Sequence, residues 1–208
     1  MGKRLAGILL GSGAAALVLG IGTATAMATT VTTWTLTPGG GVTGSAGKTI
    51  FKDTKTGSTL TCKSSATKTT LKKGSGQVNP LGKITSVTFS NCTGPNGLAF
   101  TATASASSTH PWHLVGNTYS SGVTHGNITG IMGSLSGVGC SATLAGPTAT
   151  TPGTVSGTYT NGTHTLKGSG GNLHVWNVSG CLGLINNGDP SSLVSSYTIS
   201  PPQTVTSP

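Results

Sequence analysis

Beyond residue 28, no segment of this 208-residue chain shows the sustained 3.6-residue hydrophobic periodicity of an amphipathic helix. Apolar residues instead alternate with polar or small ones over short runs, as they do from Leu98 to Ala104, and Thr and Val are frequent in these runs. Turns rich in Gly, Pro and Asn separate the runs. The pattern predicts an all-β fold, an antiparallel β-sandwich or barrel of about eleven short strands.

Several strands and turns are predicted individually. Residues 84–89 form the strongest strand candidate, and residues 193–199 are expected to form the last strand. The dipeptide Asn161-Gly162 favours the tight turn of a β-hairpin. Residues 146–153 contain two prolines, which cannot donate to a strand ladder, so we expect a loop there.

Two stretches of the chain, residues 71–94 and 166–183, have similar sequences. Each begins with Leu-Lys, passes through Gly-Ser-Gly into an apolar strand, and ends in Ser-x-Cys-x-Gly. One interpretation is an internal repeat with halves at residues 48–105 and 123–200. The other is chance, because the chain is so rich in Gly, Thr and Ser that short matches are common.

The four cysteines, Cys62, Cys92, Cys140 and Cys181, are an even set. In an exported chain of this size, an even set predicts two disulfides, and four cysteines allow three pairings. We expect Cys62 to pair with Cys92 and Cys140 with Cys181, because one local disulfide in each half suits the repeat interpretation.

The amino terminus has the three parts of a secretory signal peptide. Lys3 and Arg4 precede an apolar run over residues 5–21, and small residues with two A-x-A cleavage motifs follow. A membrane anchor is the alternative, but the run is short and no stop-transfer pattern follows it. We therefore expect residues 1–26 to be a cleaved signal peptide and residues 27–208 to be a single all-β domain without a transmembrane span. The expected location is extracellular or associated with the cell wall.

Charge is concentrated in one third of the chain. After signal removal nine lysines remain with no arginine and no glutamate, and the only acidic residues are Asp53 and Asp189. Eight of the lysines fall within one short region: Lys48, Lys52, Lys55, Lys63, Lys68, Lys72, Lys73 and Lys83. Such a cluster predicts binding to an anionic cell-wall polymer through counterion release. The alternative is a solvated face that keeps the protein soluble. Specific nucleic-acid binding is not expected, because arginine and interleaved aromatic residues are lacking.

The composition argues against an enzyme. Glycoside hydrolysis in its usual form needs two carboxylates, and Asp53 and Asp189 both sit in turn sequences where aspartate commonly binds its own backbone. The pair His110 and His113 would point to opposite faces of a strand, and no thiolate pair or spare carboxylate accompanies it. No catalytic residue, cofactor or metal site is therefore predicted.

A second candidate site involves aromatic residues, because these hold sugars in many extracellular β domains. Trp34 and Trp176 sit in alternating strands and are expected to be buried. Trp112, beside a proline and between two histidines, is expected to be the exposed tryptophan. A ligand face for a carbohydrate or small molecule is therefore predicted at His110, Trp112, His113 and Tyr119.

Five segments carry a family resemblance: WTLTPGG near the start, TLTC, the Cys-Thr-Gly-Pro-x-Gly turn, GGNLHVWNVSGC, and the closing YTISPPQTVTSP. With them the chain resembles a group of small secreted four-cysteine proteins from Streptomyces and related actinobacteria over nearly its full length. The resemblance implies secretion and a compact, disulfide-bonded β fold, and it transfers no catalytic residue.

Two functional hypotheses follow from the sequence. The first is a secreted, non-enzymatic protein that acts at the cell surface or wall through its lysine-rich face. The alternative is a carbohydrate- or small-ligand-binding β module with its site near Trp112. The sequence leaves the oligomeric state open under both hypotheses.

Overall fold

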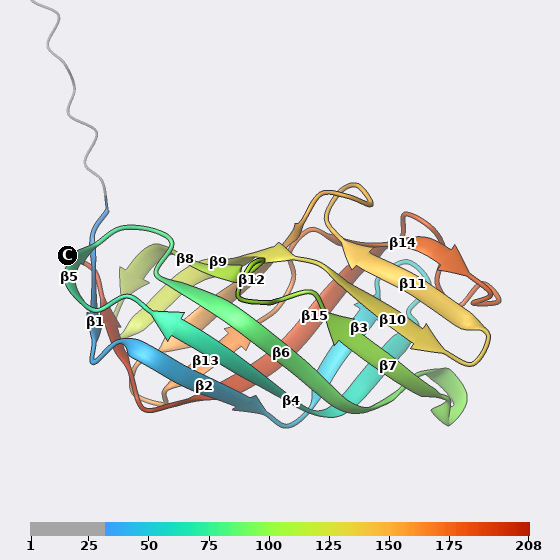
Figure 1. The fold of residues 1–208 in the computed structure, drawn as a ribbon, viewed down its shortest axis with the longest axis horizontal. Coiled ribbons are helices and arrows are strands. Elements are labelled where there is room, and N and C mark those ends of the chain that lie inside the picture. The colour runs from blue at the N-terminus through green and yellow to red at the C-terminus, as the bar shows by residue number, and fades with distance from the viewer. Residues whose placement is uncertain (1–31) are drawn as a thin grey trace, which may run out of the picture. The chain divides into compact units, whose positions relative to one another are not determined.

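The computed structural model describes residues 32–208 (Figure 1). The strands are β1 (Trp34–Thr37), β2 (Gly40–Ala46), β3 (Thr49–Asp53), β4 (Thr59–Leu71), β5 (Gly74–Gln77), β6 (Gly82–Thr93), β7 (Ala99–Ala104), β8 (Trp112–Ser120), β9 (Val123–Ile131), β10 (Gly133–Gly137), β11 (Cys140–Ala145), β12 (Gly153–Thr160), β13 (Thr165–Gly168), β14 (Leu173–Ser179), β15 (Pro190–Ser200) and β16 (Thr204–Thr206). One short 3₁₀ turn, η1 (Pro95–Gly97), joins β6 to β7. The predicted all-β fold is confirmed.

Thirteen of the strands form one antiparallel sheet that closes on itself. Ten of the strands continue one another in five pairs, so the chain crosses the sheet eight times. The crossings are β2 with β3, β4, β6, β7 with β8, β9 with β10, β11 with β12, β13 with β14, and β15. Each crossing pairs with the next, and β15 pairs back to both β2 and β3. The result is an up-and-down barrel, which is the second of the two predicted architectures.

The strand count is higher than the predicted eleven, because most of the long crossings are interrupted. Residues 146–152 separate β11 from β12 and include both prolines of the predicted loop, so that prediction is confirmed. Residues 169–172 separate β13 from β14 and include Gly170 and Gly171, both with positive φ. Proline has no N–H to donate to the sheet, and glycine with a positive φ departs from the strand conformation. Both interrupt the hydrogen bonding of a strand, but the chain continues in the same direction across the barrel.

The barrel has two different ends, which we call the cap end and the open-loop end. At the cap end a separate three-stranded sheet of β16, β1 and β5 lies across the strand termini (Figure 1). Its side chains Trp34, Leu36 and Val205 are buried and pack with Leu81 in one cluster. Both ends of the described chain therefore close one end of the barrel. The open-loop end carries residues 54–58, 94–98, 138–139 and 180–189.

The main hydrophobic core fills the barrel toward the open-loop end. Its buried side chains come from nearly every crossing and include Phe51, Trp112 and Leu193. The rings of Phe51 and Phe89 meet edge to face with centroids 5.1 Å apart. Two separate buried clusters, one with Trp34 and one with Tyr197, pack the rest of the interior.

Both expected disulfides are present, with S–S distances of 2.03 Å for Cys62–Cys92 and 2.04 Å for Cys140–Cys181. Cys62 and Cys92 are directly opposite each other on β4 and β6, inside the main core. Cys140 begins β11, and Cys181 follows β14, its neighbour in the sheet. The predicted pairing is confirmed.

Two predictions are not resolved by the fold. The signal peptide, residues 1–26, lies outside the described residues. The two similar stretches, residues 71–94 and 166–183, differ in their surroundings, since the first spans the β5 excursion and the second follows β13 directly into β14. The repeat interpretation stays a prediction. In residues 32–208, no helix has the length and apolar character needed to cross a membrane.

Candidate functional site

The eight clustered lysines lie on consecutive strands of the barrel and on the turns that join them. Lys52 is in β3, Lys63 and Lys68 are in β4, and Lys83 is in β6. The others occupy the adjoining turns: Lys48, Lys55, Lys72 and Lys73. We call the outer face of β2, β3, β4 and β6 with these eight residues the lysine wall. Antiparallel pairing makes this possible, because a contiguous segment of chain folds into neighbouring strands.

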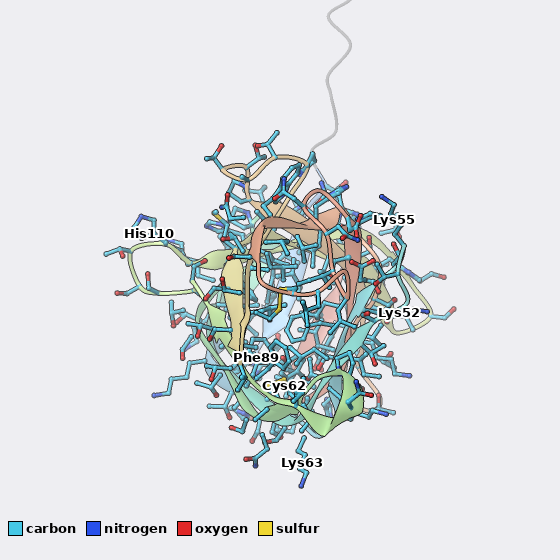
Figure 2. All side chains as sticks on the ribbon, turned by 90° about the vertical axis from the view of Figure 1, so that its right-hand side faces the viewer. Lys52, Lys55, Cys62, Lys63, Phe89 and His110 are labelled. Atoms are coloured by element: carbon cyan, nitrogen blue, oxygen red, sulfur yellow. A yellow bond between two sulfur atoms is a disulfide. The ribbon has the colours of Figure 1, made fainter. Side chains whose placement is uncertain are left out.

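The side chains of the lysine wall point into solvent. Seven of the eight lysines are exposed, and Lys72 is half-buried. The Lys72 ammonium group donates a 2.7 Å hydrogen bond to the carbonyl oxygen of Val78. In Figure 2, which faces the open-loop end, Lys52, Lys55 and Lys63 point away from the barrel. The wall is therefore accessible to a large partner.

Register places the central lysines close together. Lys68 of β4 is opposite Ser86 of β6, and Thr70, two residues further along β4, is opposite Lys83. From ordinary strand dimensions the backbone positions of Lys68 and Lys83 are about 8 Å apart, and those of Lys63 and Lys68 are about 17 Å apart. The separation of Lys68 and Lys83 is similar to the Debye length of about 8 Å at physiological salt, so these two charges act jointly on a polymer, whereas Lys63 lies about two Debye lengths from Lys68.

Among residues 32–208 only one lysine of the wall forms an ion pair. Lys55 Nζ lies 3.1 Å from Asp189 Oδ1, and the Asp189 side chain is only 2% exposed. Asp189 Oδ2 also accepts hydrogen bonds from the backbone N–H and the side-chain amide of Asn186, at 3.0 and 2.9 Å. Burial alone would raise the pKa of the Asp189 carboxyl, but the hydrogen bonds from Asn186 and Lys55 outweigh it. The pKa of Asp189 therefore lies below its ordinary value of 3.8.

The other acidic residue has a similar structural role. Asp53 Oδ1 accepts hydrogen bonds from the backbone N–H groups of Lys55 and Thr56, both at 2.9 Å. The Thr56 hydroxyl in turn donates a 2.7 Å bond to the carbonyl oxygen of Leu184, which joins this turn to the loop before β15. The predicted turn roles of Asp53 and Asp189 are confirmed, and both carboxylates are buried.

The predicted exposure of Trp112 is wrong. Its side chain is only 6% exposed and belongs to the main core, because β8 begins at this residue with its ring directed into the barrel. His110 is exposed in the loop before β8, and His113 is half-buried. Tyr119 packs instead against the separate cluster at the cap end. The four residues therefore do not form one exposed ligand face.

The other two tryptophans were expected to be buried. Trp34 is completely buried, as predicted. Trp176 is half-buried, and its indole N–H donates a 3.0 Å hydrogen bond to the carbonyl oxygen of Gly146. None of the tryptophans in the described chain offers the open platform on which sugars stack.

The structure also contains a feature that the sequence did not predict, a cavity of about 80 Å³ inside the cap half of the barrel. Leu36 and Val205 of the cap sheet line it, together with aliphatic side chains of the surrounding strands. Three inward-facing glycines also line it, Gly116 of β8, Gly126 of β9 and Gly157 of β12. Gly126 is paired with both Gly116 and Gly157, so a row of residues without side chains crosses β8, β9 and β12.

The close approach of neighbouring strands explains why glycine occupies these positions. A Cβ atom added at Gly157 would lie 2.5 Å from the Lys167 carbonyl oxygen on β13, so the strands approach too closely for any side chain there. Glycines of this kind allow sharp strand curvature in a small barrel. Gly126, within the otherwise strand-like residues 123–132, was the signal in the sequence, since glycine is disfavoured within strands.

Within residues 32–208, no group of three or more His, Cys, Asp or Glu side chains is placed to hold a metal ion. Comparison of the chain with protein-family models, with curated proteins and with solved structures finds no match. The resemblance to secreted actinobacterial proteins therefore stays a prediction. The fold and its surface define a disulfide-bonded, all-β barrel with one lysine-rich wall and an internal apolar cavity.

Proposed function

We propose that this is a secreted, non-enzymatic protein that acts at the bacterial cell surface or wall and binds anionic envelope polymer through the lysine wall. The observation that carries the proposal is that seven of the eight ammonium groups have no carboxylate partner in the described chain, although they lie on one face. A solvated face would need only a dispersed charge. Grouped, unpaired cations gain most from releasing the counterions of a polyanion.

The chemistry of the wall suits an irregular polymer. Lysine carries a compact charge on a flexible stem, so it follows phosphate or carboxylate groups without fixed geometry. Exposed hydroxyls of Thr43, Thr70 and Thr88 lie between the lysines and offer additional hydrogen bonds. Binding would therefore depend on charge density rather than on the exact sequence of the polymer.

Other features support the non-enzymatic and extracellular parts of the proposal. Asp53 and Asp189, the acidic residues after the signal segment, are buried and bound within turns, so neither is presented to a substrate. Two disulfides are typical of an oxidising, extracellular compartment. The alternative site near Trp112 loses its support, because that ring is buried in the core.

The test is retention of the purified, oxidised protein on isolated bacterial cell wall through a series of salt concentrations. Retention should fall steeply between low and moderate salt and should be abolished when all eight wall lysines are replaced by glutamine. A relocation variant is the matched control for net charge. It combines Lys63→Gln, Lys68→Gln and Lys83→Gln with three lysines placed at exposed positions of β10 and β12, which do not pair with the strands of the wall: Ser134→Lys, Ser136→Lys and Ser156→Lys.

The relocation variant has the charge of the natural chain but a depleted wall, so its retention should fall at each salt concentration. A Lys→Arg version of all eight positions should retain binding. If the relocation variant binds as well as the natural chain, the attraction depends on net charge and the wall is not the site. If the natural chain is not retained at any salt, the proposal is wrong.

A further inference from the structure

The internal cavity of the cap half has no role in polymer binding, which takes place on the outside of the barrel. Its lining contains no charged residue and is dominated by aliphatic side chains such as Val42, Leu114, Ile128 and Leu166. An ion would lose its hydration there without gaining a counter-charge, so an ionic occupant is excluded. An uncharged, mainly apolar molecule fits this lining.

One fully buried polar atom of the lining residues has no hydrogen-bond partner. The buried side-chain polar atoms without a hydrogen bond in residues 32–208 are Trp34 Nε1, Asp53 Oδ2, Trp112 Nε1 and Thr124 Oγ1. Thr124 is the member of this set whose residue lines the cavity, and it is 7% exposed. A buried hydroxyl that lacks a partner costs about 1–3 kcal/mol, and a ligand with one hydroxyl or carbonyl group would remove that cost.

Two other polar side chains of the lining already have hydrogen-bond partners. The Tyr159 hydroxyl donates a 2.8 Å hydrogen bond to the carbonyl oxygen of Gln203. The Gln203 side-chain oxygen accepts from the backbone N–H of Gly39 at 2.8 Å, and its amide donates to Pro201 at 3.0 Å. The Thr124 hydroxyl is therefore the fully buried polar group of the lining that remains to anchor a ligand.

The volume limits the size of the ligand. A water occupies about 30 Å³ in the liquid, so a cavity of 80 Å³ has room for about two to three waters or a molecule of about three heavy atoms. We infer that the cap half of the barrel binds a small, uncharged, mainly apolar molecule whose single hydroxyl or carbonyl group hydrogen-bonds to Thr124 Oγ1. The site is separate from the lysine wall and does not depend on it.

The test uses ethanol and propane, which have the same shape and differ in that a hydroxyl of ethanol replaces a methyl group of propane. Binding to the complete oxidised protein is measured by methyl shifts of Ile128 and Leu166 in NMR titrations, with propane dissolved under gas pressure. Both molecules should bind, and Thr124→Val should lower the affinity for ethanol about tenfold relative to that for propane, since one hydrogen bond is lost. Thr118→Val, at an exposed position of β8, is the matched control and should change neither affinity.

A second variant locates the site. Ile128→Phe should fill the cavity and abolish binding of both molecules, and where this variant does not fold, the methyl shifts in the natural chain locate the ligand instead. Absence of binding by both molecules would show that the cavity holds water or nothing and would overturn the inference. Equal effects of Thr124→Val on the two affinities, or methyl shifts confined to another region, would also overturn it.

Discussion

The disulfide Cys62–Cys92 offers the most direct test of how this fold is stabilised. Its cysteines are 30 residues apart, and closing a loop of that length in the unfolded chain corresponds to about 3.7 kcal/mol in the chain-entropy model. The same model gives about 3.9 kcal/mol for Cys140–Cys181, whose separation is 41 residues. The two disulfides are therefore expected to stabilise the barrel almost equally.

The oxidised protein, the reduced protein and a variant without the two cysteines separate the contribution of the disulfide bond from that of the buried sulfur atoms. Reduction breaks the bonds without removing atoms, whereas Cys62→Ala with Cys92→Ala also removes two buried sulfurs from the core. Each resulting small cavity costs about 1 kcal/mol, so the variant should lose about 5–6 kcal/mol in total. For a chain of this size, 1 kcal/mol shifts the melting temperature by about 2–4 °C, which predicts a fall of at least about 10 °C.

Thermal and urea unfolding followed by circular dichroism provide the measurement. If the disulfide acts through the unfolded state, the variant should also show a larger m-value, because the unlinked chain exposes more surface. A fall in melting temperature below about 3 °C, with an unchanged m-value, would refute this reasoning. It would show that the strand ladders of the closed barrel, and not the disulfide, hold β4 and β6 together.

Two further predictions concern Asp189 and the glycine row. The pKa of Asp189 is lower in the folded protein than its ordinary value of 3.8, so its contribution to stability is present above about pH 4 and is lost as the pH falls further. The urea midpoint should therefore fall less between pH 7 and pH 3 in Asp189→Asn than in the natural chain, and an equal fall in both would contradict this. Gly157→Ala should cost about 1–3 kcal/mol, because its Cβ would meet the Lys167 carbonyl, whereas Gly41→Ala has open space and should stay within about 0.5 kcal/mol. Thermal unfolding measures both, and similar values for the two would show that the strands can separate at little cost.

Much of the local structure could be predicted from the sequence, because it depends on residues close together in the chain. Alternation and turn residues indicated the strands, and the turn sequences around Asp53 and Asp189 indicated their backbone hydrogen bonds. The cysteine pairing was expected from the preference for one local disulfide in each half of the chain, and the structure confirms it. The eight lysines fall within one short region of the sequence, and they lie on one region of the surface because consecutive strands of this barrel are neighbours.

Other features depend on which strands meet and on which side chains face inward. The sequence around Trp112 suggested exposure, but the start of β8 directs this ring into the core. The partner of Asp189 could not be predicted either, because Lys55 approaches it only after β3 has paired with β15. The residues next to Trp112 do not indicate its burial, and the residues next to Asp189 do not indicate its ion pair with Lys55.

The sequence by itself determined the all-β character, the disulfides and the grouping of positive charge, because these follow from local pattern and composition. Only the tertiary structure decided that the sheet closes on itself, that the chain ends cover one end of the barrel, and that a cavity lies beneath them. Closure depends on the pairing of β15 with β2 and β3, and the cavity depends on glycines of three separate strands meeting in one row. Both arise from register between distant segments, which no single stretch of the chain encodes.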